Sequence, residues 1–191
     1  MRNDPVAREI ASAARVRSAG WLAVFSAAMI PALLQTPEYA RPALALGREV
    51  TGREAAQAAT VRTGAQAMLT EPGRKFAFLL TEGAVRTWPG SPALMPAQLD
   101  RLLQVAELPN VRLGVVPWSA PVPAFPLHGF TIYDGTVSVA ESFTGDVTLS
   151  GEAELAAHEE IFESFAAAAV YGDDLRILLA RIRTEFARLP A

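Results

Sequence analysis

The stretch Ile-Pro-Ala-Leu-Leu-Gln-Thr-Pro-Glu-Tyr-Ala-Arg, residues 30–41, joins an apolar run to the start of a helix. Thr36 supplies a hydroxyl that can accept from the free N–H groups of a first helical turn, and Pro37 follows where no N–H is needed. Glu38 places a carboxylate at the positive end of the helix dipole. We therefore predict that a helix begins at Pro37, and that Leu33 and its neighbour anchor the segment in the core.

The predicted elements on either side of this stretch indicate a mixed fold. Upstream, Asp4 and Pro5 begin an amphipathic helix that runs to about Gly20, and the apolar run 21–30 fits either a buried helix or a strand. Downstream, Asp134-Gly135 marks a hairpin turn. Further helices are expected over 37–46 (shortened or kinked by Pro42), 51–69, 82–86, 95–108, 152–171 and 174–188, and strands over 75–80, 111–118, 130–133, 137–142 and 147–149.

This order predicts an α/β or α+β domain with a small mixed β-sheet and a terminal hairpin, covered by N-terminal and C-terminal helices. We expect a single domain over 1–191, with a mainly helical part at 1–70, strand–helix–strand and hairpin at 71–150, and closing helices at 151–191. The proline-rich loop between Trp118 and Gly129 is of a kind that often carries function.

Composition excludes several classes of function. The chain has 191 residues, 51% of them hydrophobic and 19% charged, with a net charge of −3 and no cysteine. The weak negative charge argues against direct binding to nucleic acid, which needs a concentrated basic face. Without cysteine there is no disulfide or thiolate site, so we expect a cytoplasmic protein. The apolar run 21–34 is too short to cross a bilayer, and no metal-ligand or cofactor motif occurs.

The quoted stretch also resembles the Pro-Gly-Leu-Leu-Gln-Thr-x-x-Tyr-Ala signature of the DUF5753 family, an actinobacterial domain usually found behind an Xre-type helix-turn-helix in transcriptional regulators. The likeness continues in the same order along nearly the entire chain. It is carried by Arg62 and Gln66, by 80–86, by 98–103, by Pro109-Asn110-Val111, by Val116-Pro117, and by Gly129-Phe130, Asp134 and Glu141.

Three departures limit what this resemblance implies. Ala32 stands where the family favours glycine, and Ala65 replaces an arginine. The signature begins about thirty residues after Met1, so we expect no helix-turn-helix in front of it. Membership of the family would then not imply DNA binding, and a free-standing sensor, a regulator of other proteins and an enzyme all stay open.

Candidate site residues come from the loops and from charged positions on apolar elements. His128 ends the proline-rich loop, whereas His158 lies beside two glutamates and is expected on a solvated helix face. Glu82 and Glu141 are further acid–base candidates. The structural alternative is an ion pair with Arg62 or Arg86, because a buried carboxylate without a partner is strongly destabilising. The complete set of expected ligand contacts is Tyr39, Arg62, Glu82, Arg86, Trp88, Trp118, Phe125, His128 and Tyr133.

These features lead to two main hypotheses. The first is a small-molecule-binding or regulatory domain of the DUF5753 type, with an apolar pocket between the sheet and the N-terminal helices. The alternative is an enzyme of bacterial secondary metabolism that folds a substrate in an apolar cavity, with His128, Glu82 or Glu141 as acid–base groups. A third is a structural partner protein. We expect no cofactor and no metal, an apolar small molecule as ligand, no membrane contact, and either a second copy or a cognate regulator protein as partner.

Overall fold

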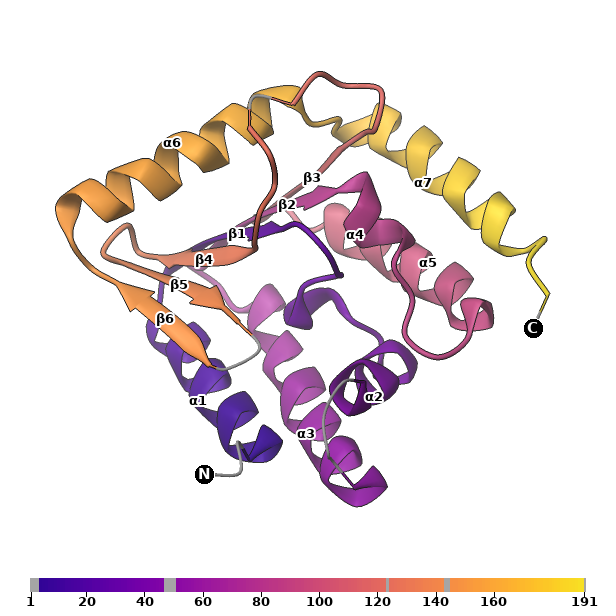
Figure 1. The fold of residues 1–191 in the computed structure, drawn as a ribbon, viewed down its shortest axis with the longest axis horizontal. Coiled ribbons are helices and arrows are strands. Elements are labelled where there is room, and N and C mark those ends of the chain that lie inside the picture. The colour runs from indigo at the N-terminus through magenta and orange to yellow at the C-terminus, as the bar shows by residue number, and fades with distance from the viewer. Residues whose placement is uncertain (1–3, 47–50, 123, 143–144, 191) are drawn as a thin grey trace.

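Six strands form one mixed sheet in the computed structural model, which describes residues 4–46, 51–122, 124–142 and 145–190. The strand order is β3-β2-β1-β4-β5-β6 (Figure 1). The strands are β1 (Trp21–Ser26), β2 (Lys75–Thr81), β3 (Val111–Val116), β4 (Phe130–Tyr133), β5 (Val137–Glu141) and β6 (Asp146–Leu149). β1, β2 and β3 are parallel, and β4, β5 and β6 join antiparallel. The predicted α/β class with a mixed sheet and a hairpin is confirmed.

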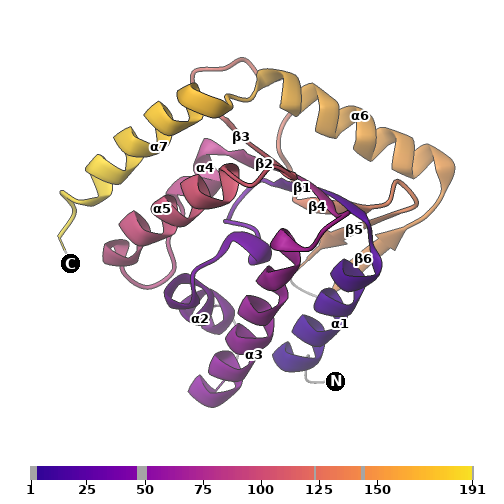
Figure 2. The same cartoon turned by 180° about the vertical axis from the view of Figure 1, so that it is seen from behind.

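Helices cover both faces of the sheet (Figure 2). They are α1 (Pro5–Ser18), α2 (Pro37–Ala45), α3 (Gly52–Gly64), α4 (Glu82–Arg86), α5 (Met95–Ala106), α6 (Glu152–Ala168) and α7 (Gly172–Phe186), with short 3₁₀ turns at Ala32–Leu34, Ala65–Thr70 and Pro92–Leu94. The larger core joins one sheet face to α1, α5 and α7, and a smaller core joins the other face to α6. Helix α3 packs on α1 and α2. None of the helices among the described residues is long and apolar enough to cross a membrane.

Strand β1 resolves the ambiguous apolar run. It pairs with β2 on one side and β4 on the other, and its four central residues, Leu22 to Phe25, are all buried. Leu22 and Val24 contribute to the larger core, whereas Phe25 contributes to the smaller one. A strand that is covered on both faces is apolar at every position, so its sequence does not alternate between polar and apolar residues. For this reason periodicity could not distinguish a strand from a buried helix here.

The signature stretch forms the predicted helix start and is held by a buried glutamine of α5. The Tyr39 N–H donates to the Thr36 hydroxyl over 3.2 Å, as a capping residue requires. Gln98 is completely buried, and its amide donates to the carbonyl of Leu34 and accepts from the N–H of Thr36. Helix α2 continues past Pro42 to Ala45, one residue short of the expected end. The stretch is therefore fastened to the core through its backbone.

The hairpin turn is tied directly to the central strand. Asp134 and Gly135 have φ values of 51° and 65°, the left-handed pair that a two-residue hairpin loop needs. Asp134 Oδ1 also accepts from the N–H groups of Gly20 and Trp21, at 2.9 and 2.8 Å. One aspartate therefore fixes both the turn and the register of β4 against β1.

Helix α6 ends earlier than its sequence suggests. It was expected to reach residue 171 but stops at Ala168, because Val170 exchanges two backbone hydrogen bonds with Val115 of β3, at 3.1 and 2.8 Å. The chain then turns at Gly172, whose φ is +53°, and starts α7 two residues before the predicted start. Pairing with the sheet edge has replaced the last helical turn.

Candidate functional site

The carboxyl ends of the parallel strands β1–β3 bring several predicted site residues to one edge of the sheet. Thr81 closes β2, and its hydroxyl accepts from the N–H of Ala84, which caps α4. The same hydroxyl donates to the carbonyl of Ala27, just after β1, over 2.7 Å. This cap places Glu82 at the carboxyl ends of the parallel strands. In open α/β sheets ligands bind preferentially at this edge, near the point where the strand order reverses.

Glu82 is a buried carboxylate with both oxygens occupied. Its side chain is 2% exposed, and Oε1 accepts from Arg86 Nε at 2.8 Å and from Arg181 Nη2 at 3.5 Å. Oε2 accepts from the backbone N–H of Trp118 at 2.9 Å. The carboxylate therefore joins the end of β2, the loop that follows β3 and helix α7. The pairing of Glu82 with Arg86, one of the alternatives weighed from the sequence, is present.

Arg86 extends this charge cluster toward the surface. Its guanidinium also pairs with Glu185 of α7 and lies 4.7 Å from the centre of the Trp118 ring. The hydrogen bond that Arg86 donates to Glu185 is the main reason that the pKa of Arg86 is raised, and the same bond lowers the pKa of Glu185. Arg181 and Glu185 are four residues apart on one helix, a spacing that could have drawn attention to them in the sequence.

The loop from Pro117 to Gly129, of which residue 123 lies outside the described part, presents large apolar side chains to solvent, and its Trp118 contacts this cluster. Trp118 is 69% exposed, Phe125 85% and Leu127 86%. Val122, at 48%, adds to the same loop. Several large apolar side chains exposed within one loop are a candidate binding region, because exposed apolar patches often mark interaction sites.

His128, near the end of the loop, lies close to His158 of α6, with ring centres 6.0 Å apart. His128 is exposed. The expectation of a solvated His158 was wrong: it is 8% exposed, stacks on Phe130 at 4.2 Å, and its Nδ1 lies 2.7 Å from the hydroxyl of the fully buried Ser138. Burial lowers the pKa of His158, and the nearby His128 lowers it further.

A sequence signal for this buried pair did exist. His158, Phe162 and Phe165 follow one another at spacings of four and three residues, which places them on one helix face. That face packs on the smaller core. The glutamates beside His158 in the sequence point elsewhere, because neighbours in a helix lie about 100° apart.

Arg62 and Tyr39, two other predicted contacts, hold the N-terminal half together. Arg62 binds Glu9 of α1 through two nitrogen–oxygen contacts of 2.9 and 2.5 Å, and it donates to Gln35 Oε1 at 2.8 Å. The Tyr39 side chain is 1% exposed and its hydroxyl donates to the carbonyl of Thr87 at 3.0 Å. Burial raises the pKa of Tyr39 to about 12. Both residues are away from the exposed loop.

The remaining candidates lie apart from Glu82. Trp88 packs edge-on against Phe186. Glu141 is the last residue of β5, three places along the sheet from β2 and opposite Asp146, and Tyr133 is a half-buried residue of β4. The space between the sheet and the N-terminal helices, where a pocket was expected, contains core side chains such as Leu22 and Val24.

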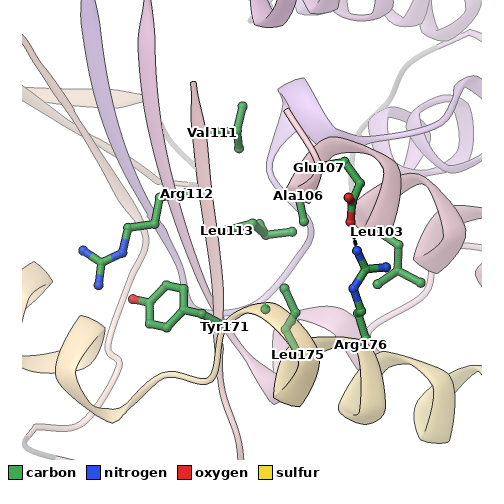
Figure 3. Close-up of a pocket in the computed structure, with 10 residues that line it drawn as sticks. Leu103, Ala106, Glu107, Val111, Arg112, Leu113, Tyr171, Leu175 and Arg176 are labelled. Carbon is green, nitrogen blue, oxygen red and sulfur yellow. Dashed lines mark hydrogen bonds and ion pairs between the residues drawn. The ribbon is translucent and has the colours of Figure 1, made fainter. Parts of the chain in front are cut away.

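A pocket of about 190 Å³ instead lies beside β3, at the free edge of the sheet (Figure 3). It contains none of the residues predicted from the sequence. The lining consists of Leu103, Ala106, Glu107, Val111, Arg112, Leu113, Tyr171, Gly172, Leu175 and Arg176. Within the described residues, no cluster of three acidic or histidine side chains is arranged to hold a metal ion.

Comparison with known proteins gives a family and no activity. Residues 11–181 match the model of DUF5753, which is described as a domain of unknown function. The comparison with curated proteins found no match. Because the matched part includes every strand and all but the ends of the first and last helices, this chain belongs to the DUF5753 family.

Proposed function

We propose that this chain is a small-molecule-binding, regulatory domain whose ligand is a largely apolar molecule bound at the carboxyl edge of β1–β3. The observation that carries the proposal is the exposure of Trp118, Phe125 and Leu127 on one loop, whose Trp118 contacts both residues of the Glu82–Arg86 ion pair. The resemblance to the domain that follows an Xre-type helix-turn-helix favours a regulatory role for that binding.

The energetics of these side chains support an apolar ligand. Burying one large apolar side chain is worth roughly 1.5–3 kcal/mol, so covering two or three of them supplies several kcal/mol toward binding. The charge cluster contains two arginines and two glutamates, so its formal charges cancel. Such a cluster can orient one polar group of a ligand, but it has no excess charge that would attract a highly charged molecule.

The alternative, an enzyme of bacterial secondary metabolism, would use the same edge. His128 is the exposed titratable side chain of the loop and would be its acid–base group. Glu82 is less suited to this role because both of its oxygens already accept hydrogen bonds. This alternative predicts turnover of the bound molecule, and loss of that turnover in His128→Ala with binding retained.

The test starts with native mass spectrometry of the chain after gentle purification, to identify a co-purifying molecule. That molecule is then added back in thermal unfolding experiments, where binding to the folded state raises the melting temperature. We expect Phe125→Ser/Leu127→Ser to abolish both the bound mass and the shift. Ile177→Ser on α7, where the side chain is 68% exposed, is the matched control and should behave as wild type.

Two results would overturn the proposal. One is a wild-type chain that carries no bound molecule and gains no stability from any metabolite of an extract of the producing cells. The other is a bound molecule whose affinity is the same in the loop variant and in the Ile177 control. Either result would leave the exposed loop without a role in ligand binding.

A further inference from the structure

Strand β3 is an edge strand, and only part of the backbone on its outer side is paired with another segment. The sheet lies on one side, where the N–H of Phe76 in β2 donates to the carbonyl of Asn110. On the other side Val115 pairs with Val170. Because backbone groups alternate along a strand, the N–H and C=O of Leu113 point to the same outer side as those of Val115. Among the described residues, no strand pairs with Leu113 there.

The pocket described above occupies the place of the missing partner. An antiparallel segment that pairs residue 170 with Val115 would bring residue 172 opposite Leu113. The chain leaves the edge at that point, because Gly172 adopts a φ of +53° and α7 begins. The space left opposite Leu113 is the pocket of about 190 Å³, bounded by β3, the end of α5 and the start of α7 (Figure 3).

The pocket walls differ on the two faces of the sheet. The face toward which Leu113 points is apolar and is formed by Leu103, Ala106 and Leu175. The other face carries Arg112, whose guanidinium lies 4.5 Å from the centre of the Tyr171 ring. Within the described residues Arg112 makes no ion pair, unlike Arg176 on the rim, which binds Glu107.

We propose that this pocket binds an extended peptide segment of a partner protein, which adds to β3 as an antiparallel strand. The peptide residue opposite Leu113 exchanges two backbone hydrogen bonds with it and points an apolar side chain toward Leu103 and Leu175. Its sequence neighbours point to the other face, where an acidic side chain pairs with Arg112. The recognised pattern is thus an apolar residue next to Asp or Glu, and addition to a free sheet edge is an established mode of peptide recognition.

A second copy of this chain is a poor occupant of the same edge. Pairing β3 with β3 across Leu113 would place two Arg112 side chains on one face as diagonal neighbours, within reach of each other, and their like charges would repel. The peptide site also shares no residue with the ligand site at the carboxyl edge. The two proposals therefore stand or fall separately.

The experiment selects random heptapeptides displayed on messenger RNA against the full chain and measures the affinity of an enriched, fluorescein-labelled peptide. We expect enrichment of an apolar residue adjacent to Asp or Glu. Arg112→Glu should weaken binding at least about tenfold, and replacing the acidic peptide residue by Lys should restore it. Arg53→Glu, on the exposed surface of α3, is the matched control and should leave the affinity unchanged.

N-methylated peptides test strand addition on the unmodified protein. Methylation of the apolar residue's amide removes the donor to Leu113 and should weaken binding at least about tenfold. Methylation of an adjacent amide, which points away from β3, should change the affinity by less than about twofold. A selection without enrichment, binding that is equal in Arg112→Glu and wild type, or equal effects of the two methylations would overturn the proposal.

Discussion

The ring of Tyr171 lies directly on Gly114, so that a Cβ added to Gly114 would stand 2.7 Å from Tyr171 Cζ. The ring is also held by Arg112, and its hydroxyl donates to the carbonyl of Ala166 at 3.1 Å. Gly114 is thus the position at which β3 makes room for the segment that closes α6. A side chain there has to displace a ring that is fixed at three points.

Gly114→Ala should therefore destabilise the chain by about 1–3 kcal/mol, the usual cost of overpacking. Urea unfolding measures this loss. In the Tyr171→Ala background the same substitution should cost much less, because the ring it would displace is gone. Equal costs in both backgrounds would show that the Gly114–Tyr171 contact is not the cause.

Gln98→Ala should lower the free energy of unfolding by at least about 2 kcal/mol. It leaves the buried carbonyl of Leu34 and the N–H of Thr36 without partners, at about 1–3 kcal/mol for each group. Gln104→Ala removes the same side chain from an exposed position of the same helix and is the control. If the two variants unfold at the same denaturant concentration, Gln98 does not hold the signature stretch.

Glu82→Gln should cost about 1.5–3 kcal/mol, because a neutral amide replaces the buried carboxylate that accepts from Arg86, while Arg86 keeps its pair with Glu185. Glu107→Gln provides the comparison. Its pair with Arg176 joins side chains that are 58% and 50% exposed, and such a pair contributes less than about 1 kcal/mol. Thermal unfolding of both variants, at low and high salt, measures the difference, and equal losses would contradict the assigned role of burial.

The buried His158 predicts a fall in stability under mildly acidic conditions. Its pKa lies below the ordinary value of 6.5 in the folded chain, so the unfolded chain binds the proton more readily. Stability is therefore complete above pH 6.5 and falls as the pH drops toward the folded pKa, by less than about 1.4 kcal/mol per pH unit. Unfolding between pH 7 and 5 should show this slope in wild type, most of it in His128→Gln because burial is the larger cause of the lowered pKa, and a flatter slope in His158→Gln. A slope unchanged by the His158 substitution would contradict it.

Local signals predicted those parts of the fold that depend on neighbours in the sequence. The Thr36 cap of α2 and the Asp134-Gly135 turn are present as expected, because each is completed within a few residues. The early end of α6 was not predictable in this way. It depends on Val115, a residue 55 positions away from its partner, and no local pattern records that pairing.

In the candidate site, too, contacts between sequence neighbours could be predicted, whereas contacts between separate elements could not. Glu82 and Arg86 are four residues apart on one helix, so their pairing follows from the sequence. The hydrogen bond between His158 and Ser138, and the pairing of Arg62 with Glu9, join separate elements. The pocket beside β3 was missed because it is formed where a segment turns away from the sheet, and the sequence pattern of β3 itself contains no sign of that.

Strand β1 is synthesised before the other five strands of this sheet and lies in the middle of the sheet (Figure 1). It pairs with β2 about fifty residues later and with β4 more than a hundred residues later. A nascent chain that ends before the hairpin therefore exposes an apolar strand with one open edge, which is the surface that chaperones recognise and that aggregates. Fragments of this domain that end between residues 117 and 129 should be insoluble even though they contain all three parallel strands.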